Sequence, residues 1–173
     1  MQFTVEFQVE HLARALEAVR REIATPQEML GSFGDSLLRV NQERHNKGLD
    51  PDGRPWKALA PSTLAEGKRK GGPLNKTGRM LGISFAYQVN GDTLRLGFDG
   101  GDGFKAKFHQ DGSRAHVISA TKAKALRFGG MFRKRVNHPG LPARRLVGFP
   151  SSDQQLVADV AEDHLTAVLN RVR

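Results

Sequence analysis

The residues best suited to catalysis or metal binding are few and poorly spaced. The chain has six histidines and no cysteine, so thiolate zinc sites, disulfides and cysteine nucleophiles are excluded. His109 and Asp111 flank Gln110 and could form a ligand pair in a metal-dependent nuclease. A metal site needs about three protein ligands, and the spacing shows no third one. The nuclease is therefore the least supported of three functional hypotheses.

Motifs of other enzyme classes are missing from the sequence. It contains no GxSxG nucleophile elbow and no P-loop. The glycine-rich run at 100–104 follows a predicted hairpin strand, and no long helix is expected after it to direct amide groups at a phosphate. The acidic residues are scattered over predicted helix surfaces and offer no catalytic pair. We therefore expect a protein that is not an enzyme and that has no cofactor.

The stretch from Arg114 to Arg145 is the most unusual feature, because its charged residues are all basic. The whole chain has a formal net charge of +9. Such a segment repels itself unless something anionic receives it. The receiver is either an acidic face of a neighbouring subunit or DNA, and the remaining alternative is a solvated loop. Phe128, Met131 and Phe132 favour a docked arm, because a free loop would leave these apolar side chains in water.

Two groups of interaction residues are predicted from this stretch and from the loops before it. Trp56, the only tryptophan, lies in a predicted loop, where its indole is either a buried anchor or an interface hot spot. The residues predicted to contact another subunit or partner are Trp56, Arg127, Phe128, Met131, Phe132, Arg133, Lys134, Arg135, Arg144 and Arg145. Those that could contact DNA in a channel are Lys68, Arg69, Lys70, Lys122 and Lys124, of which the first three could equally form a solvated face.

Apolar periodicity places these residues on predicted elements. The pattern predicts a strand over 2–9, helices over 12–23, 29–47 and after Ser151, a hairpin of strands 83–89 and 93–98, and strands within 116–128. Thr25 is expected to cap the second helix, with Pro26 in its first turn. Residues 100–103 are predicted as a flexible turn, followed by one helical turn that ends at Gly112.

Together these elements predict an α+β fold and a single domain over residues 1–173. A small antiparallel β-sheet would pack with the N-terminal and C-terminal helices, and an extended basic β-hairpin arm would span about 114–145. The apolar content of 38% suits a globular chain, and no apolar run reaches the roughly eighteen residues that a membrane helix needs. The N-terminus lacks a signal-peptide pattern, so we expect the protein to stay in the cytoplasm where it is made.

Four short sequence elements follow one another in order along the chain. The first, a P-D-G-x-x-W-x-P-L-x-x-x-T stretch, is matched by Pro51, Asp52, Gly53, Trp56, Leu59 and Thr63. The others are LNKTGRML, with leucines around T-G, FHQDG, an H-Q-x-G element, and PARRLVGF, a P-A-R-x-x-x-G element before the last helix. Together they resemble the phage virion morphogenesis family, which includes tail completion proteins, and the likeness extends from about residue 28 to residue 170. Ala60 stands where the family often has a small polar residue.

The resemblance implies a structural role in joining the phage head to its tail. Relatives resemble small tail-terminator and neck proteins that assemble as rings, often hexameric, around the DNA channel, and the family brings no catalytic residues. We accordingly expect a virion protein of the neck or tail region. Its expected partners are further copies of itself, other neck or tail proteins and, in passing, genomic DNA, with no membrane contact. A DNA-binding protein that uses the arm at 114–145 is the alternative.

Overall fold

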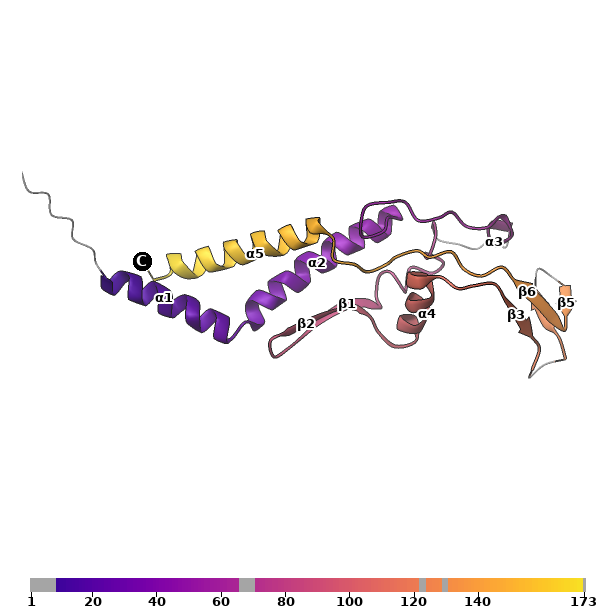
Figure 1. Cartoon of the computed structure of the whole chain (residues 1–173), viewed down its shortest axis with the longest axis horizontal. Coiled ribbons are helices and arrows are strands. Elements are labelled where there is room, and N and C mark those ends of the chain that lie inside the picture. The colour runs from indigo at the N-terminus through magenta and orange to yellow at the C-terminus, as the bar shows by residue number, and fades with distance from the viewer. Residues whose placement is uncertain (1–8, 66–70, 122–123, 129–130, 173) are drawn as a thin grey trace, which may run out of the picture. The chain divides into compact units, whose positions relative to one another are not determined.

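The structure is a computed structural model that describes residues 9–65, 71–121, 124–128 and 131–172 (Figure 1). Its helices are α1 (Val9–Ala24), α2 (Gln27–Lys47), α3 (Pro61–Ala65), α4 (Gly100–Asp111) and α5 (Ser151–Asn170). Its strands are β1 (Phe85–Asn90), β2 (Thr93–Phe98), β3 (His116–Ser119), β4 (Leu126–Phe128), β5 (Met131–Arg133) and β6 (Arg135–His138). No described helix has the length and apolar character needed to cross a membrane. The mixture of helices and antiparallel strand pairs confirms the predicted α+β class.

The described residues form two compact units. The first contains α1, the start of α2 up to Leu37, the turn end of the β1–β2 hairpin (Tyr87–Leu96) and α5. Helices α1 and α5 lie side by side in this unit (Figure 1), where Nε2 of His164 lies 2.6 Å from Oε1 of Glu22. The second contains the rest of α2, the loops after it, α4 and strands β3 to β6.

Helix α1 keeps much of its apolar side in solvent. Val9, Leu12, Leu16 and Ile23 are between 59% and 68% exposed, and no residue of the helix is buried. These positions repeat at the spacing of one helix face. The first unit therefore has an apolar stripe on α1 that its own described residues leave largely uncovered.

The hairpin meets α2 within the first unit through Tyr87. The aromatic ring of Tyr87 occupies the place where a Cβ atom of residue 34 would lie, so the contact depends on Gly34 having no side chain. The Tyr87 hydroxyl donates a hydrogen bond of 2.9 Å to Oδ1 of Asp35. This bond raises the pKa of Tyr87, because the neutral hydroxyl is the form that donates. Gly31, one turn earlier, faces open space.

The core of the second unit is small and rich in rings. Trp56, Leu81, Ala106 and Leu146 form its buried apolar cluster. The imidazole of His45 lies beside it, with ring centroids 4.9 Å from Phe85, 5.7 Å from Trp56 and 6.0 Å from Phe98. These residues come from α2, a loop, the hairpin, α4 and the segment after the arm. The core therefore fixes pieces of chain that are far apart in the sequence.

Several predicted elements differ from the structure. The predicted strand at 2–9 lies outside the described residues except for Val9, which begins α1. Thr25 does not cap α2, because its hydroxyl donates to the carbonyl oxygen of Arg21 in α1, at 3.0 Å. The glycine run predicted as a flexible turn is the first turn of α4, which spans Gly100–Asp111.

The strands do not join into one sheet. They form three two-stranded pairs, β1 with β2, β3 with β6 and β4 with β5. Both predicted strands of the first hairpin are confirmed, with Gly91 at a φ of +61° in the turn between them. The single domain over 1–173 stays a prediction.

Candidate functional site

Gln110 near the end of α4 binds the segment that follows the arm. Its Oε1 accepts hydrogen bonds from the backbone amides of Leu146 at 2.7 Å and Val147 at 3.1 Å. Its Nε2 donates to the carbonyl oxygen of Val147 at 2.8 Å. One amide side chain thus pairs with the backbone of an extended segment much as a neighbouring strand would.

The loop at 49–58 is attached to the same segment from another side. The indole Nε1 of Trp56 donates to the carbonyl oxygen of Arg145 at 2.8 Å. The guanidinium of Arg145 lies 2.6 Å from Oδ2 of Asp52. Trp56 is only 7% exposed, as the buried-anchor alternative requires. Its role in an interface with another molecule is untested.

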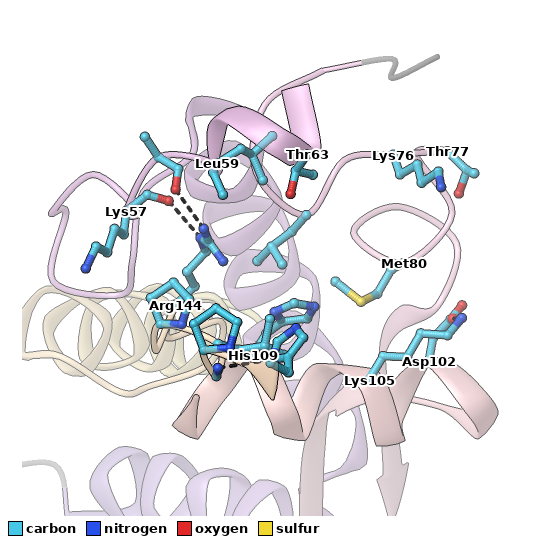
Figure 2. Close-up of a pocket in the computed structure, with 18 of the residues that line it drawn as sticks. Lys57, Leu59, Thr63, Lys76, Thr77, Met80, Asp102, Lys105, His109 and Arg144 are labelled. Carbon is cyan, nitrogen blue, oxygen red and sulfur yellow. Dashed lines mark hydrogen bonds and ion pairs between the residues drawn. The ribbon is translucent and has the colours of Figure 1, made fainter. Parts of the chain in front are cut away.

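Arg144 is a buried cation that binds backbone oxygens. Its side chain donates to the carbonyl oxygens of Lys57 at 2.8 Å and Ala58 at 2.9 Å (Figure 2). Its backbone amide donates to the carbonyl oxygen of His109 at 2.6 Å. A charge that is 5% exposed is costly unless its donors are satisfied, and these bonds meet that need.

Two glycines allow close approaches between the segments of this region. Gly112 ends α4 at a φ of +72°, and a Cβ atom there would lie 2.6 Å from the carbonyl oxygen of Leu141. A Cβ atom on Gly148 would lie 2.9 Å from Cβ of Pro51. Both positions need a residue without a side chain. We call the assembly of the 49–58 loop, residues 109–112 and residues 141–148 the junction.

His45 completes the junction from α2. Its Nε2 lies 2.8 Å from the carbonyl oxygen of Leu146, so this nitrogen carries the proton and donates. Burial lowers the pKa of His45, because the surrounding rings offer the charged form little solvation. His45 is therefore neutral near pH 7 and acts as a structural donor.

The geometry gives no support to a metal-dependent nuclease. His109 and Asp111 are two positions apart on α4, and side chains at that spacing do not face each other on a helix. Burial, and then the nearby charge of Arg144, lower the pKa of His109. In the described part of the chain, no group of three or more histidine, aspartate or glutamate side chains could hold a metal ion. The prediction that the protein is not an enzyme remains a prediction.

The strands β3 to β6, residues 116–138, form a narrow ribbon beyond the junction. β3 pairs antiparallel with β6, and β4 with β5. Neighbouring residues of a strand point to opposite faces, so exposure of both members shows that neither face is covered. Val117 and Ile118 are 48% and 38% exposed, and Met131 and Phe132 are 51% and 72% exposed. Neither face of the ribbon therefore packs on a core.

The predicted interaction residues divide between the ribbon, the junction and the uncertain segments. Arg127, Phe128, Met131, Phe132, Arg133, Lys134 and Arg135 lie on the ribbon, and Lys124 is exposed just before β4. Trp56, Arg144 and Arg145 lie in the junction. Lys68, Arg69, Lys70 and Lys122 are outside the described residues. The sequence analysis missed Gln110 and His45 as positioning residues. For Gln110 the signal was its place in the H-Q-x-G element.

The junction contains three of the four elements that carried the family resemblance. A model of the phage virion morphogenesis family matches residues 7–166. The chain belongs to this family. The match begins earlier than the likeness noted in the sequence and includes α1. No curated protein and no solved structure matches the chain.

Membership of the family establishes a role in the assembly of a phage virion and a virion-associated location. The geometry explains what the family's sequence elements do in this chain. Asp52 and Trp56 of the first element bind Arg145 of the fourth, and Gln110 of the third binds the backbone of Leu146 and Val147 in the fourth. These family residues therefore form a scaffold that holds the base of the ribbon.

Proposed function

We propose that this protein is a non-enzymatic component of the head–tail connection, acting in the neck, in tail completion or as a tail terminator. Copies of the chain form a ring, hexameric in the simplest form, and the ribbon docks on the next subunit or on another virion protein. The observation that carries the proposal is a ribbon with charged and apolar side chains and no covered face.

The physical reason for docking is that such a ribbon has little stability of its own. An isolated two-stranded hairpin is marginally stable in water, because it has no core. Burying Met131 and Phe132 against a partner would remove apolar surface from water at roughly 25 cal/mol per Å². Exposed Arg127, Arg133 and Arg135 would at the same time meet acidic groups of that partner.

The apolar stripe on α1 supports self-association independently. Four large apolar side chains on one helix face are more than the scattered exposure expected of a monomer. A ring needs two different surfaces on each subunit, because a closed ring joins subunits head to tail. The ribbon and the α1 stripe are two such surfaces.

The experiment replaces the outer ribbon and measures assembly. The backbone amide of Ala120 donates to the carbonyl oxygen of Lys134 at 2.9 Å, so residues 121–133 can be replaced by an Asn-Gly turn that leaves β3 and β6 paired. We expect the full chain to form rings in negative-stain images and by light scattering. The shortened chain should stay monomeric, with an unchanged helical signal in circular dichroism and unchanged Trp56 fluorescence. Rings of the shortened chain would refute docking by the ribbon.

A charge variant with a matched control separates protein docking from DNA binding. The test variant is R127Q/R133Q/R135Q, and the control is R14Q/R39Q/R95Q, which removes the same charge from exposed positions elsewhere. For a DNA-binding protein, log affinity for duplex DNA should fall steeply with log salt, by about 0.9 for each phosphate contacted, and only the ribbon variant should flatten that slope. For the head–tail protein, both variants should bind DNA weakly, and only the ribbon variant should fail to assemble.

A further inference from the structure

A large pocket lies in the second unit, between the loop after α2, the residues before β1, α4 and the base of the ribbon. Its volume is about 1160 Å³. Figure 2 shows Arg144 on one side of it and Asp102 with Lys105 on the other. Single pockets for small molecules are roughly 300–1,000 Å³, so the space is larger than most metabolites need. A pocket of this volume can hold a short peptide segment.

The charged groups that line the pocket are mostly cations. They are Lys57, Lys76, Arg79, Lys105 and Arg144, against the single carboxylate of Asp102. Five positive groups and one negative group leave a formal charge of +4. Lys57 and Lys76 are exposed, so their charges are available to an incoming group, whereas the exposed Arg79 and Lys105 share the Asp102 carboxylate. Arg144 is held by its backbone contacts.

The Asp102 carboxylate offsets part of the positive charge of the two cations that it contacts, Lys105 and Arg79. Oδ1 of Asp102 lies 2.7 Å from Nζ of Lys105, and Oδ2 accepts a hydrogen bond of 2.7 Å from Ser84 and lies 3.5 Å from Arg79. These contacts lower the pKa of Asp102, the bond from Lys105 contributing most. The ammonium groups of Lys57 and Lys76 make no comparable bond to any described residue.

The rest of the lining is largely apolar. Leu59, Leu74, Met80, Leu141 and Pro142 contribute to it. Leu74 has a φ of +64°, a conformation that a side chain of its size rarely adopts, so the backbone of this wall is strained. Cationic groups around apolar walls match a ligand that carries carboxylates and at least one apolar side chain. A DNA duplex would meet the exposed lysines but would leave the apolar walls in water.

We propose that this pocket binds an extended acidic peptide segment of a partner protein, with carboxylates at Lys57 and Lys76 and an apolar side chain against Leu74 and Met80. The site is separate from the ribbon surface used for ring formation, although residues 138–142 at the ribbon base line it. The proposal therefore goes beyond the head–tail role and does not need ring assembly.

The test measures binding of labelled synthetic peptides to the full chain by fluorescence anisotropy. The probe alternates Glu and Leu. One control peptide alternates Gln and Leu and lacks the charge, and a second alternates Glu and Ser and lacks the apolar side chains. A labelled DNA duplex is the competing ligand class. We expect binding of the Glu-Leu probe, weakened by salt, and little binding of either control peptide.

Protein variants locate the site. K57E/K76E reverses two charges of the lining whose side chains form no ion pair with any residue that the structure describes. R54E/K107E is the matched control, because both residues are exposed in the same unit and outside the pocket lining. K57E/K76E should weaken the affinity for the Glu-Leu probe about tenfold or more, and tenfold corresponds to about 1.4 kcal/mol. R54E/K107E should leave this affinity nearly unchanged.

Three outcomes would overturn the proposal. Failure of the wild-type chain to bind the Glu-Leu probe would do so, as would equal weakening by both double variants or a preference for the duplex. The chain with residues 121–133 replaced should still bind the probe, because the pocket lining is retained. Loss of ring formation with retained probe binding thus shows that the two proposals can fail separately.

Discussion

Removal of the Gln110 side chain is the sharpest test of the junction. In Gln110→Ala, the backbone amides of Leu146 and Val147 lose their acceptor, and the carbonyl oxygen of Val147 loses its donor. Each hydrogen bond contributes about 1 kcal/mol net, and an unsatisfied buried group costs about 1–3 kcal/mol. The side chain is partly buried, so water replaces some of this loss, while alanine favours the helix by a few tenths of a kcal/mol.

The expected loss is therefore about 2–3 kcal/mol in the free energy of unfolding. For a chain of this length, 1 kcal/mol shifts the midpoint temperature by about 2–4 °C, so Tm should fall by about 4–12 °C. Urea denaturation followed by Trp56 fluorescence is a suitable assay. Trp56 is the only tryptophan and its indole binds the residue beside Leu146, so its emission reports on the junction directly.

Gln155→Ala provides the matched control. Among the described residues, the side chain of Gln155 bonds only to Asp159, on the exposed surface of α5 in the first unit. Its removal should change stability by less than about 0.5 kcal/mol. If Gln110→Ala unfolds at the same urea concentration as Gln155→Ala and the wild type, the backbone pairing does not stabilise the junction and our account of it is wrong.

Two further predictions concern stability away from the partner surfaces. Because burial lowers the pKa of His45, the unfolded chain binds a proton at this residue more readily than the folded chain does. The contribution of His45 to stability should therefore be complete above about pH 6.5 and decline as the pH falls below that value. Urea midpoints at several pH values measure this, and a flat profile would contradict it. Gly31→Ala should stabilise α2 by about 0.5–1 kcal/mol, whereas Gly34→Ala should destabilise the protein by about 1–3 kcal/mol, since its methyl group meets the ring of Tyr87. Equal melting temperatures of the two alanine variants would show that the ring moves aside without cost.

Local patterns were enough to predict the elements that depend on neighbouring residues. The stripe of α5, the end of α2 at Gly48 and the hairpin around Gly91 follow from spacing and turn chemistry, and all are confirmed. The first turn of α4 was missed because its glycines are poor helix formers. Asp102 in that turn is held by Ser84 and Lys105, and such contacts are not visible in a local window.

The candidate site was harder to predict because its bonds join distant residues. Gln110 reaches residues 36 and 37 positions away, and Arg144 binds carbonyl oxygens 86 and 87 positions away. No periodicity encodes such pairs. The positive charge of the arm was visible in the sequence, and on that basis Arg144 was predicted to lie on a partner surface. Its guanidinium instead donates hydrogen bonds to backbone oxygens within the subunit, which the charge pattern alone does not reveal.

Backbone hydrogen bonds hold the two chain segments at the base of the ribbon together, and this matters for docking. Ser113 and Leu141 exchange two backbone hydrogen bonds, of 2.9 and 3.0 Å, at the point where the chain leaves α4 and returns to the junction. Gly140, at a φ of +91°, lies so close to the carbonyl oxygen of Ser113 that no side chain fits between them. The strands of the ribbon therefore start from fixed positions. Binding costs less entropy when fewer groups must be ordered, so a partner needs to order only the outer ribbon. The junction residues can in this way favour assembly without touching the partner.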